Sequence, residues 1–155
     1  HVIAPSVGNR GLLRAAQRIV AEAQRKSSVK FGQFILAPPD VNRAQFLQLA
    51  NAYQSLATRT TMYVSDRDRA LGASSWLHDF SRAGFVPPVT IAPNIDTIHV
   101  SNVDLSLLGH GYVAEARDVL HDMYNLIRRN AHPSERMGLR RVTELQEGAY
   151  WIIGA

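Results

Sequence analysis

Apolar residues recur at helical spacing in four stretches of this chain, and a short run typical of a strand separates each stretch from the next. This spacing predicts helices over Asn9 to Lys26, Asn42 to Thr58, Ala70 to Phe80 and Val113 to Arg129. In the first of them, one apolar stripe lies opposite a face rich in arginine and glutamine, as expected of a helix packed on one side. Asn42 has a side chain suited to cap the second helix.

The runs between these helices are short and rich in apolar, β-branched and aromatic residues. They predict strands at Val2 and Ile3, Val29 to Ala37, Thr60 to Ser65 and Ile95 to Val103. The tail from Gly138 to Ile153 has the pattern of two further strands that turn about Glu147 and Gly148. Strands that alternate with amphipathic helices predict an α/β fold, with a mostly parallel sheet flanked by helices on both faces.

Composition limits the chemistry that this fold can perform. The chain has 155 residues, of which 46% are apolar, as expected of one domain with a packed core. It has no cysteine, which excludes disulfides, thiolate metal sites and a cysteine nucleophile. The formal charge is +4, and aromatic residues are not interleaved with the basic ones, so we expect no nucleic-acid partner.

Other motifs are missing from the sequence. No apolar run reaches the roughly 18 residues of a membrane span, and the first residues lack the zones of a signal peptide. The sequence therefore does not identify the cellular compartment of the protein. The histidines stand singly, without the paired spacing of a metal site on a helix, and no glycine-rich phosphate loop is present, so we expect no metal and no cofactor.

Polar residues follow each predicted strand of the parallel sheet. Ser6 follows the first strand, Asp40 the second, Asp66 and Asp68 the third, and residues 102–110 the fourth. Ligands of open α/β sheets bind outside the carboxyl ends of the strands. We therefore expect the chemistry of this protein to lie in these loops.

The first of these loops, Ala4-Pro5-Ser6-Val7-Gly8, approximates a nucleophile elbow. That motif is a strand–turn–helix so tight that it needs small residues two positions before and two positions after the serine, and Ala4 and Gly8 supply them. The amide of Val7 enters the start of the helix, where the helix dipole stabilises an oxyanion, so Val7 is a candidate oxyanion donor. A turn residue or helix cap is the alternative role of Ser6.

A serine hydroxyl needs an imidazole to take its proton. Among the six histidines, His110 is the preferred base because Gly109-His110-Gly111 is a loop between a predicted strand and a predicted helix. His78 and His121 lie in predicted helices and His99 in a strand, where a packing or surface role is expected.

A carboxylate must orient that imidazole, and in this architecture it lies between the serine and the histidine in chain order. Asp68 is preferred because it follows a predicted strand and lies well separated from both Ser6 and His110 along the chain. Asp66 in the same loop and Asp40 in the preceding one remain alternative acids.

Four segments taken together and in order resemble a known family: Ser6 to Leu13, Leu36 to Asp40, Tyr63 to Leu71, and Gly109 to Tyr112. They are similar to the bacterial α/β-hydrolase family of unknown function within the esterase and lipase superfamily, from the first residue to about Asn130.

The resemblance implies an α/β-hydrolase fold and a serine hydrolase that cleaves a small-molecule acyl ester through an acyl-enzyme. It implies Ser6 as nucleophile, Asp68 as acid and His110 as base. Pro5 stands where the family usually has a histidine, and Ala4 where the elbow usually has glycine. A non-catalytic binding or scaffold domain of the same fold is therefore the alternative, and an acyltransferase would use the same residues.

The family pattern also places strands and a second oxyanion donor ahead of the elbow. We therefore expect residues 1–155 to form the C-terminal part of one α/β-hydrolase domain, with 132–155 as a tail or hairpin. We expect the strand before Ser6 to lack a neighbour on one side, and to need either an N-terminal half or a second copy of the chain as its partner.

Overall fold

The computed structural model describes residues 1–23, 30–66, 81–101, 117–144 and 148–154. Within these ranges six strands form one sheet in the order β1-β2-β3-β4-β6-β5. The strands are β1 (Val2–Pro5), β2 (Phe31–Ala37), β3 (Ala57–Ser65), β4 (Ile95–Val100), β5 (Arg140–Glu144) and β6 (Gly148–Ile153). Neighbouring strands are parallel except for β5, which runs antiparallel to β6.

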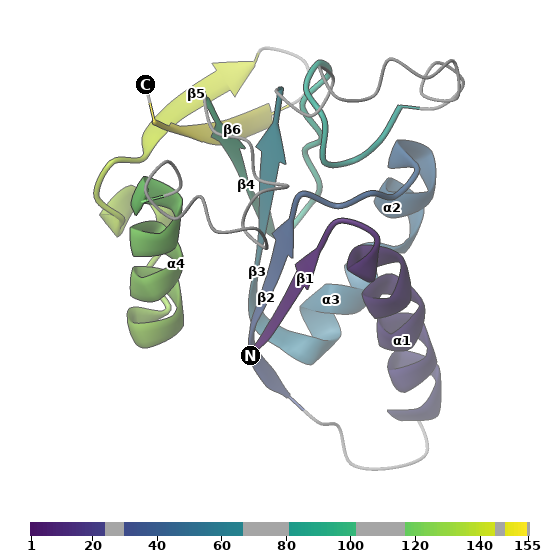
Figure 1. Cartoon of the computed structure of the whole chain (residues 1–155). Coiled ribbons are helices and arrows are strands. Elements are labelled where there is room, and N and C mark those ends of the chain that lie inside the picture. Colours follow the sequence, from purple (N-terminus) through teal and green to yellow (C-terminus); the bar gives the residue numbers. More distant parts are fainter. Residues whose placement is uncertain (24–29, 67–80, 102–116, 145–147, 155) are drawn as a thin grey trace.

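Helices cover both faces of this sheet (Figure 1). Helices α1, α2 and α3 lie on one face and α4 lies on the other. Their bounds are α1 (Gly8–Ala23), α2 (Arg43–Leu49), α3 (Asn51–Leu56) and α4 (Arg117–Arg129), and a short 3-10 turn, η4 (Pro133–Glu135), follows α4. The predicted α/β class, with a mostly parallel sheet flanked by helices, is confirmed.

Strand β2, which lies between β1 and β3, explains why the sheet needs helices on both sides. Phe34 and Leu36 are buried in the core beneath α1, α2 and α3, while Ile35 and Ala37 are buried in the core beneath α4. Successive side chains of a strand point to opposite faces, so a strand buried on both faces has an unbroken apolar run. The sequence FILA is such a run.

The helix predicted over Asn42 to Thr58 differs from the structure in two ways. The chain forms two helices that meet at Ala50, and it becomes β3 already at Ala57. Ala57 pairs with Phe31 of β2, so the pairing of the two strands overrides the helical spacing of the last residues. The expected cap is present: the side chain of Asn42 accepts a hydrogen bond from the backbone N of Gln45 at 3.1 Å.

The C-terminal strands belong to the main sheet. Strands β5 and β6 form the antiparallel pair that the sequence predicted, and β6 also pairs in parallel with β4, where Trp151 lies beside Ile98. These residues therefore extend the central sheet beyond β4.

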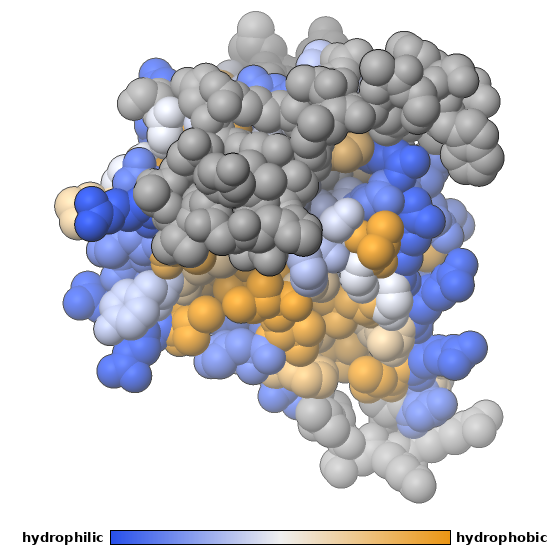
Figure 2. Space-filling view, viewed as in Figure 1, coloured by the Kyte–Doolittle hydropathy of each residue, from blue (hydrophilic) through white to orange (hydrophobic). Residues whose placement is uncertain are grey.

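Strand β1 lies at the edge of the described sheet and pairs there only with β2. Ile3 is 52% exposed, and Figure 2 shows hydrophobic residues gathered over this edge, between α1 and α4. An edge strand with exposed apolar side chains is a template for pairing with another chain segment. The need for a partner stays a prediction.

A buried polar network joins α4 to the sheet. The hydroxyl of Tyr63 on β3 donates to Oδ2 of Asp122 on α4 at 2.6 Å, and Nε of Arg136 lies 3.5 Å from Oδ1 of the same carboxylate. Burial raises the pKa of Asp122, and the charge of Arg136 and the hydrogen bond from Tyr63 lower it in part. Burial also raises the pKa of Tyr63, so its hydroxyl stays protonated and able to donate.

We expect Tyr63→Phe to lower the free energy of unfolding by about 1–3 kcal/mol, because it leaves a buried carboxylate oxygen without its donor. Urea denaturation at neutral pH measures the change. Tyr124→Phe is the matched control, since Tyr124 lies on α4 with 59% of its surface exposed; its unfolding free energy should change by less than about 0.5 kcal/mol. Equal values for the two variants would refute the role of this network.

Candidate active site

Ser6 lies in the tight turn between β1 and α1, on the side of the sheet where the carboxyl ends of the parallel strands lie (Figure 1). Its φ is +39°, in the left-handed region that residues with a Cβ rarely adopt. Its side chain is exposed. Strained backbone of this kind persists only where the surrounding structure holds it, and such residues cluster at functional sites.

Hydrogen bonds from two directions hold the backbone of Ser6. Its N donates to the carbonyl of Ala37, the last residue of β2, at 2.9 Å. Its carbonyl oxygen accepts from the backbone N of Asp40 at 3.2 Å and from that of Asn9 at 3.2 Å. The side chain of Asn9 is fully buried and donates Nδ2 to the carbonyls of Ala4 at 2.7 Å and of Ser6 at 3.0 Å. The turn is therefore tied both to the neighbouring strand and to its own helix.

Ala4 and Gly8, the small residues expected on either side of Ser6, differ in how closely their surroundings limit the size of a side chain. Ala4 is buried, with 5% of its surface exposed. A Cβ placed at Gly8 would lie 3.7 Å from Cδ of Pro5, which is an ordinary van der Waals distance. Steric crowding within this turn therefore does not explain Gly8.

Val7 lies immediately before the first residue of α1. Its carbonyl accepts from the backbone N of Arg10 at 3.0 Å, and within the described ranges its own N–H has no acceptor. The N-terminus of a helix presents unpaired N–H groups and a partial positive charge, which together favour an anion.

Asp40 is held by two arginines, and the sequence pattern gave no sign of this. Arg10 Nη2 lies 2.9 Å from Oδ2 of Asp40, and Arg82 Nη1 pairs with Oδ1. Arg10 Nε also donates to the backbone carbonyl of Asp40 at 2.8 Å. Both carboxylate oxygens of Asp40 therefore face guanidinium groups.

Asp66 follows β3, and its Oδ2 lies 4.0 Å from Nε2 of His99 on β4. The side chain of His99 is 15% exposed, and its buried Nε2 has no hydrogen-bond partner among the described residues. Burial lowers the pKa of His99, and the negative charge of Asp66 offsets part of that effect. His99 therefore has a partly buried position in the sheet, as expected for a histidine in a strand.

Asp68 and His110, the preferred acid and base, lie outside the described residues, as does the helix expected over Ala70 to Phe80. Their distances to Ser6 stay predictions. Strands β3 and β4, which precede Asp68 and His110 in the chain, run parallel to β1 and β2. Their carboxyl ends therefore lie on the same side of the sheet as Ser6.

The described ranges contain no group of three His, Cys, Asp or Glu side chains able to hold a metal ion. In those same ranges, no helix is both long and apolar enough to cross a bilayer.

Residues 1–129 match the family model described as alpha/beta hydrolase of unknown function (DUF900). The chain belongs to this α/β-hydrolase family. No curated protein and no solved structure gives a significant match to the chain. The resemblance seen in the sequence is thus confirmed at the level of the family, and the parallel sheet with helices on both faces agrees with a hydrolase fold of this kind.

We expect His99→Gln to reduce the loss of stability of this α/β-hydrolase on acidification. Burial lowers the pKa of His99 below its ordinary 6.5, so the unfolded chain binds a proton more readily than the folded one. The contribution of neutral His99 to the free energy of unfolding is therefore complete above pH 6.5. It is lost as the pH falls from 6.5 towards the lower pKa that His99 has in the folded protein. Urea denaturation between about pH 7.5 and 5.5 compares the variant with the unmodified chain.

Asp66→Asn serves as a control of opposite sign. It removes the charge that raises the pKa of His99, so its stability should fall more steeply with acid than that of the unmodified chain. A His99→Gln curve parallel to that of the unmodified chain throughout this interval would show that the pKa of His99 is not linked to folding.

Proposed function

We propose that this protein is a serine hydrolase that cleaves a carboxylic ester through an acyl-enzyme. Ser6 attacks the ester carbonyl, His110 takes the proton from the Ser6 hydroxyl and passes it to the leaving group, and Asp68 holds the imidazole ring. Water then attacks the acyl-enzyme and regenerates Ser6. The same residues would serve an acyltransferase in which another acceptor replaces water.

The conformation of Ser6 carries this proposal. An exposed serine at φ +39°, in the turn between a parallel strand and a helix, is what a nucleophile elbow needs to raise its hydroxyl above the sheet. Membership of an α/β-hydrolase family adds independent support for a nucleophile at this point of the fold. A helix-capping role for Ser6 is less favoured, because the strained backbone would bring a simple cap no benefit.

The amide of Val7 is proposed to hold the oxyanion. It directly follows the nucleophile and lies at the N-terminus of α1, with its N–H unused by any acceptor within the described ranges. Backbone donors of this kind stabilise the charge that develops in the tetrahedral intermediate, and removing one donor typically slows such enzymes about 10²–10³-fold.

Among the three candidate acids, Asp40 is the least suited to orient a histidine. Both of its carboxylate oxygens are engaged by Arg10 and Arg82. Asp66 lies beside His99 at 4.0 Å, and its side chain is 50% exposed. These positions favour Asp68 in the same loop as the partner of His110.

Pro5 is compatible with this proposal, because its missing N–H does not disturb the pairing of β1 with β2. The N of Ser6 points towards β2, where it donates to Ala37. Backbone N–H groups alternate in direction along a strand, so the position of Pro5 would point its N–H away from β2. The proline therefore removes no hydrogen bond from the described sheet, as is usual for proline in an edge strand.

We expect an organophosphonate probe to label Ser6 covalently, as shown by mass spectrometry of the labelled peptide. Ser6→Ala should abolish labelling and lower the hydrolysis of a p-nitrophenyl ester by about 10³-fold or more. Ser81→Ala is the control, because Ser81 is also exposed and should keep full labelling. Folded protein that takes up no probe would instead favour the non-catalytic binding domain.

The acid is identified by comparing three variants in the same ester assay. Asp68→Asn should lower kcat by up to about 10⁴-fold, because the histidine loses the group that fixes its tautomer. Asp66→Asn and Asp40→Asn should each have a much smaller effect on kcat. If either of these variants loses more activity than Asp68→Asn, the role of acid belongs to that residue.

A further inference from the structure

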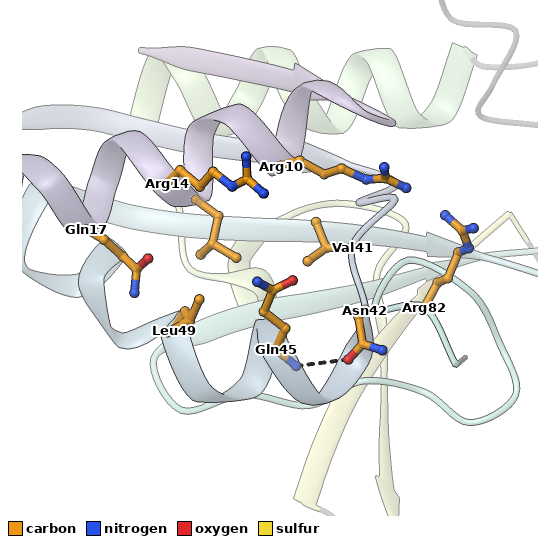
Figure 3. Close-up of a pocket in the computed structure, with 9 residues that line it drawn as sticks. Arg10, Arg14, Gln17, Val41, Asn42, Gln45, Leu49 and Arg82 are labelled. Atoms are coloured by element: carbon orange, nitrogen blue, oxygen red, sulfur yellow. Dashed lines mark hydrogen bonds between the residues drawn. The ribbon is translucent and has the colours of Figure 1, made fainter. Parts of the chain in front are cut away.

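A groove of about 360 Å³ lies between α1 and α2, and its lining is strongly basic (Figure 3). Arg10 and Arg14 come from one side of α1, and Arg82 closes the end of the groove near Asn42. The described residues that line the groove include no aspartate or glutamate. The charged groups that line the groove are therefore all hydrogen-bond donors.

The charges at the groove do not cancel. Asp40 is the carboxylate that pairs with Arg10 and Arg82, and within the described ranges Arg14 has no ion-pair partner. Three guanidinium groups and one carboxylate leave a net charge of 3 − 1 = +2. Partial burial lowers the pKa of Arg82, and the nearby positive charge of Arg10 lowers it further.

The amide side chains of the groove add further donors. Asn42 Oδ1 accepts from the backbone N of Gln45, drawn as the dashed line in Figure 3. The NH₂ group of Asn42 has no acceptor among the described residues and can donate to a ligand. The side chains of Gln45 and Gln17 also line the groove, on α2 and α1.

Backbone hydrogen bonds fix Arg82 at the end of the groove. Residues 81–84 run alongside residues 39–43: the N of Ala83 donates to the carbonyl of Val41 at 2.9 Å, and the N of Gly84 to that of Pro39 at 3.0 Å. A Cβ at Gly84 would lie 2.7 Å from the backbone N of Pro39, so only glycine allows this approach. The backbone that carries Arg82 is thus held in place before any ligand arrives.

We propose that this groove binds a phosphate monoester group. Its dianion matches the net charge of the groove, and its oxygens suit the planar, two-pronged geometry of guanidinium groups. Arg14 supplies the uncompensated charge, and the remaining nitrogens of Arg10 and Arg82 supply further donors. A free phosphate ester and a phosphate headgroup of a lipid present the same chemistry to these residues.

Isothermal titration calorimetry with glycerol 3-phosphate tests the proposal, with glycerol and acetate as ligand controls. We expect binding of glycerol 3-phosphate, none of glycerol, and weaker binding of acetate, which has a single charge. Arg14→Gln should weaken binding about tenfold or more, the usual effect of losing a charge-assisted hydrogen bond. Co-sedimentation with vesicles that contain phosphatidic acid then separates a lipid source from a soluble one.

Arg18→Gln is the matched control, because Arg18 is exposed on the same helix but does not line the groove. It should bind glycerol 3-phosphate as the unmodified chain does. Ser6→Ala should also bind normally, so this result does not depend on catalysis. The proposal is overturned if glycerol 3-phosphate does not bind at millimolar concentration, if acetate binds equally well, or if Arg14→Gln and Arg18→Gln behave alike.

Discussion

The geometry of the turn between β1 and α1 depends on the hydrogen bonds that the carbonyl oxygen of Ser6 accepts. It accepts hydrogen bonds from the backbone N of Asp40 and from both the backbone and the side chain of Asn9. The first bond ties the turn to the loop after β2, and the other two tie it to the first turn of α1. A serine held from both sides can keep a left-handed backbone that would otherwise relax, because relaxation would break several of these bonds at once.

The sheet makes this constraint possible. β2 is buried on both faces, and its last residue, Ala37, accepts the hydrogen bond from the N of Ser6. Because the neighbouring strands run in parallel, the residues after β1, β2 and β3 gather at one edge. This arrangement places the serine turn, the Asp40 loop and Asp66 near one another, although they are distant along the chain.

Asp40 links the proposed catalytic turn to the basic groove. Its backbone N binds the carbonyl of Ser6, while its carboxylate pairs with Arg10 and Arg82. The sequence offered Asp40 as a possible acid because it follows a strand. The structure gives this side chain two arginine partners, one of which comes from a segment about forty residues further along the chain. Ion pairs between distant segments depend on how backbones pack, and no local pattern encodes them.

The sequence by itself determined the class of fold, the family and the turn that holds Ser6. It also determined the order of the described strands and helices along the chain, apart from the division of one predicted helix into α2 and α3. Hydrophobic spacing and the strand–turn–helix pattern around Ser6 are local signals, which can be recognised from the sequence alone. Only the tertiary structure decided that β3 begins at Ala57, where pairing with Phe31 overrides helical spacing, and that β6 joins the sheet beside β4. Strand pairing and the meeting of Arg82 with Asp40 are contacts between distant residues, whose free energy exists only once the chain has folded.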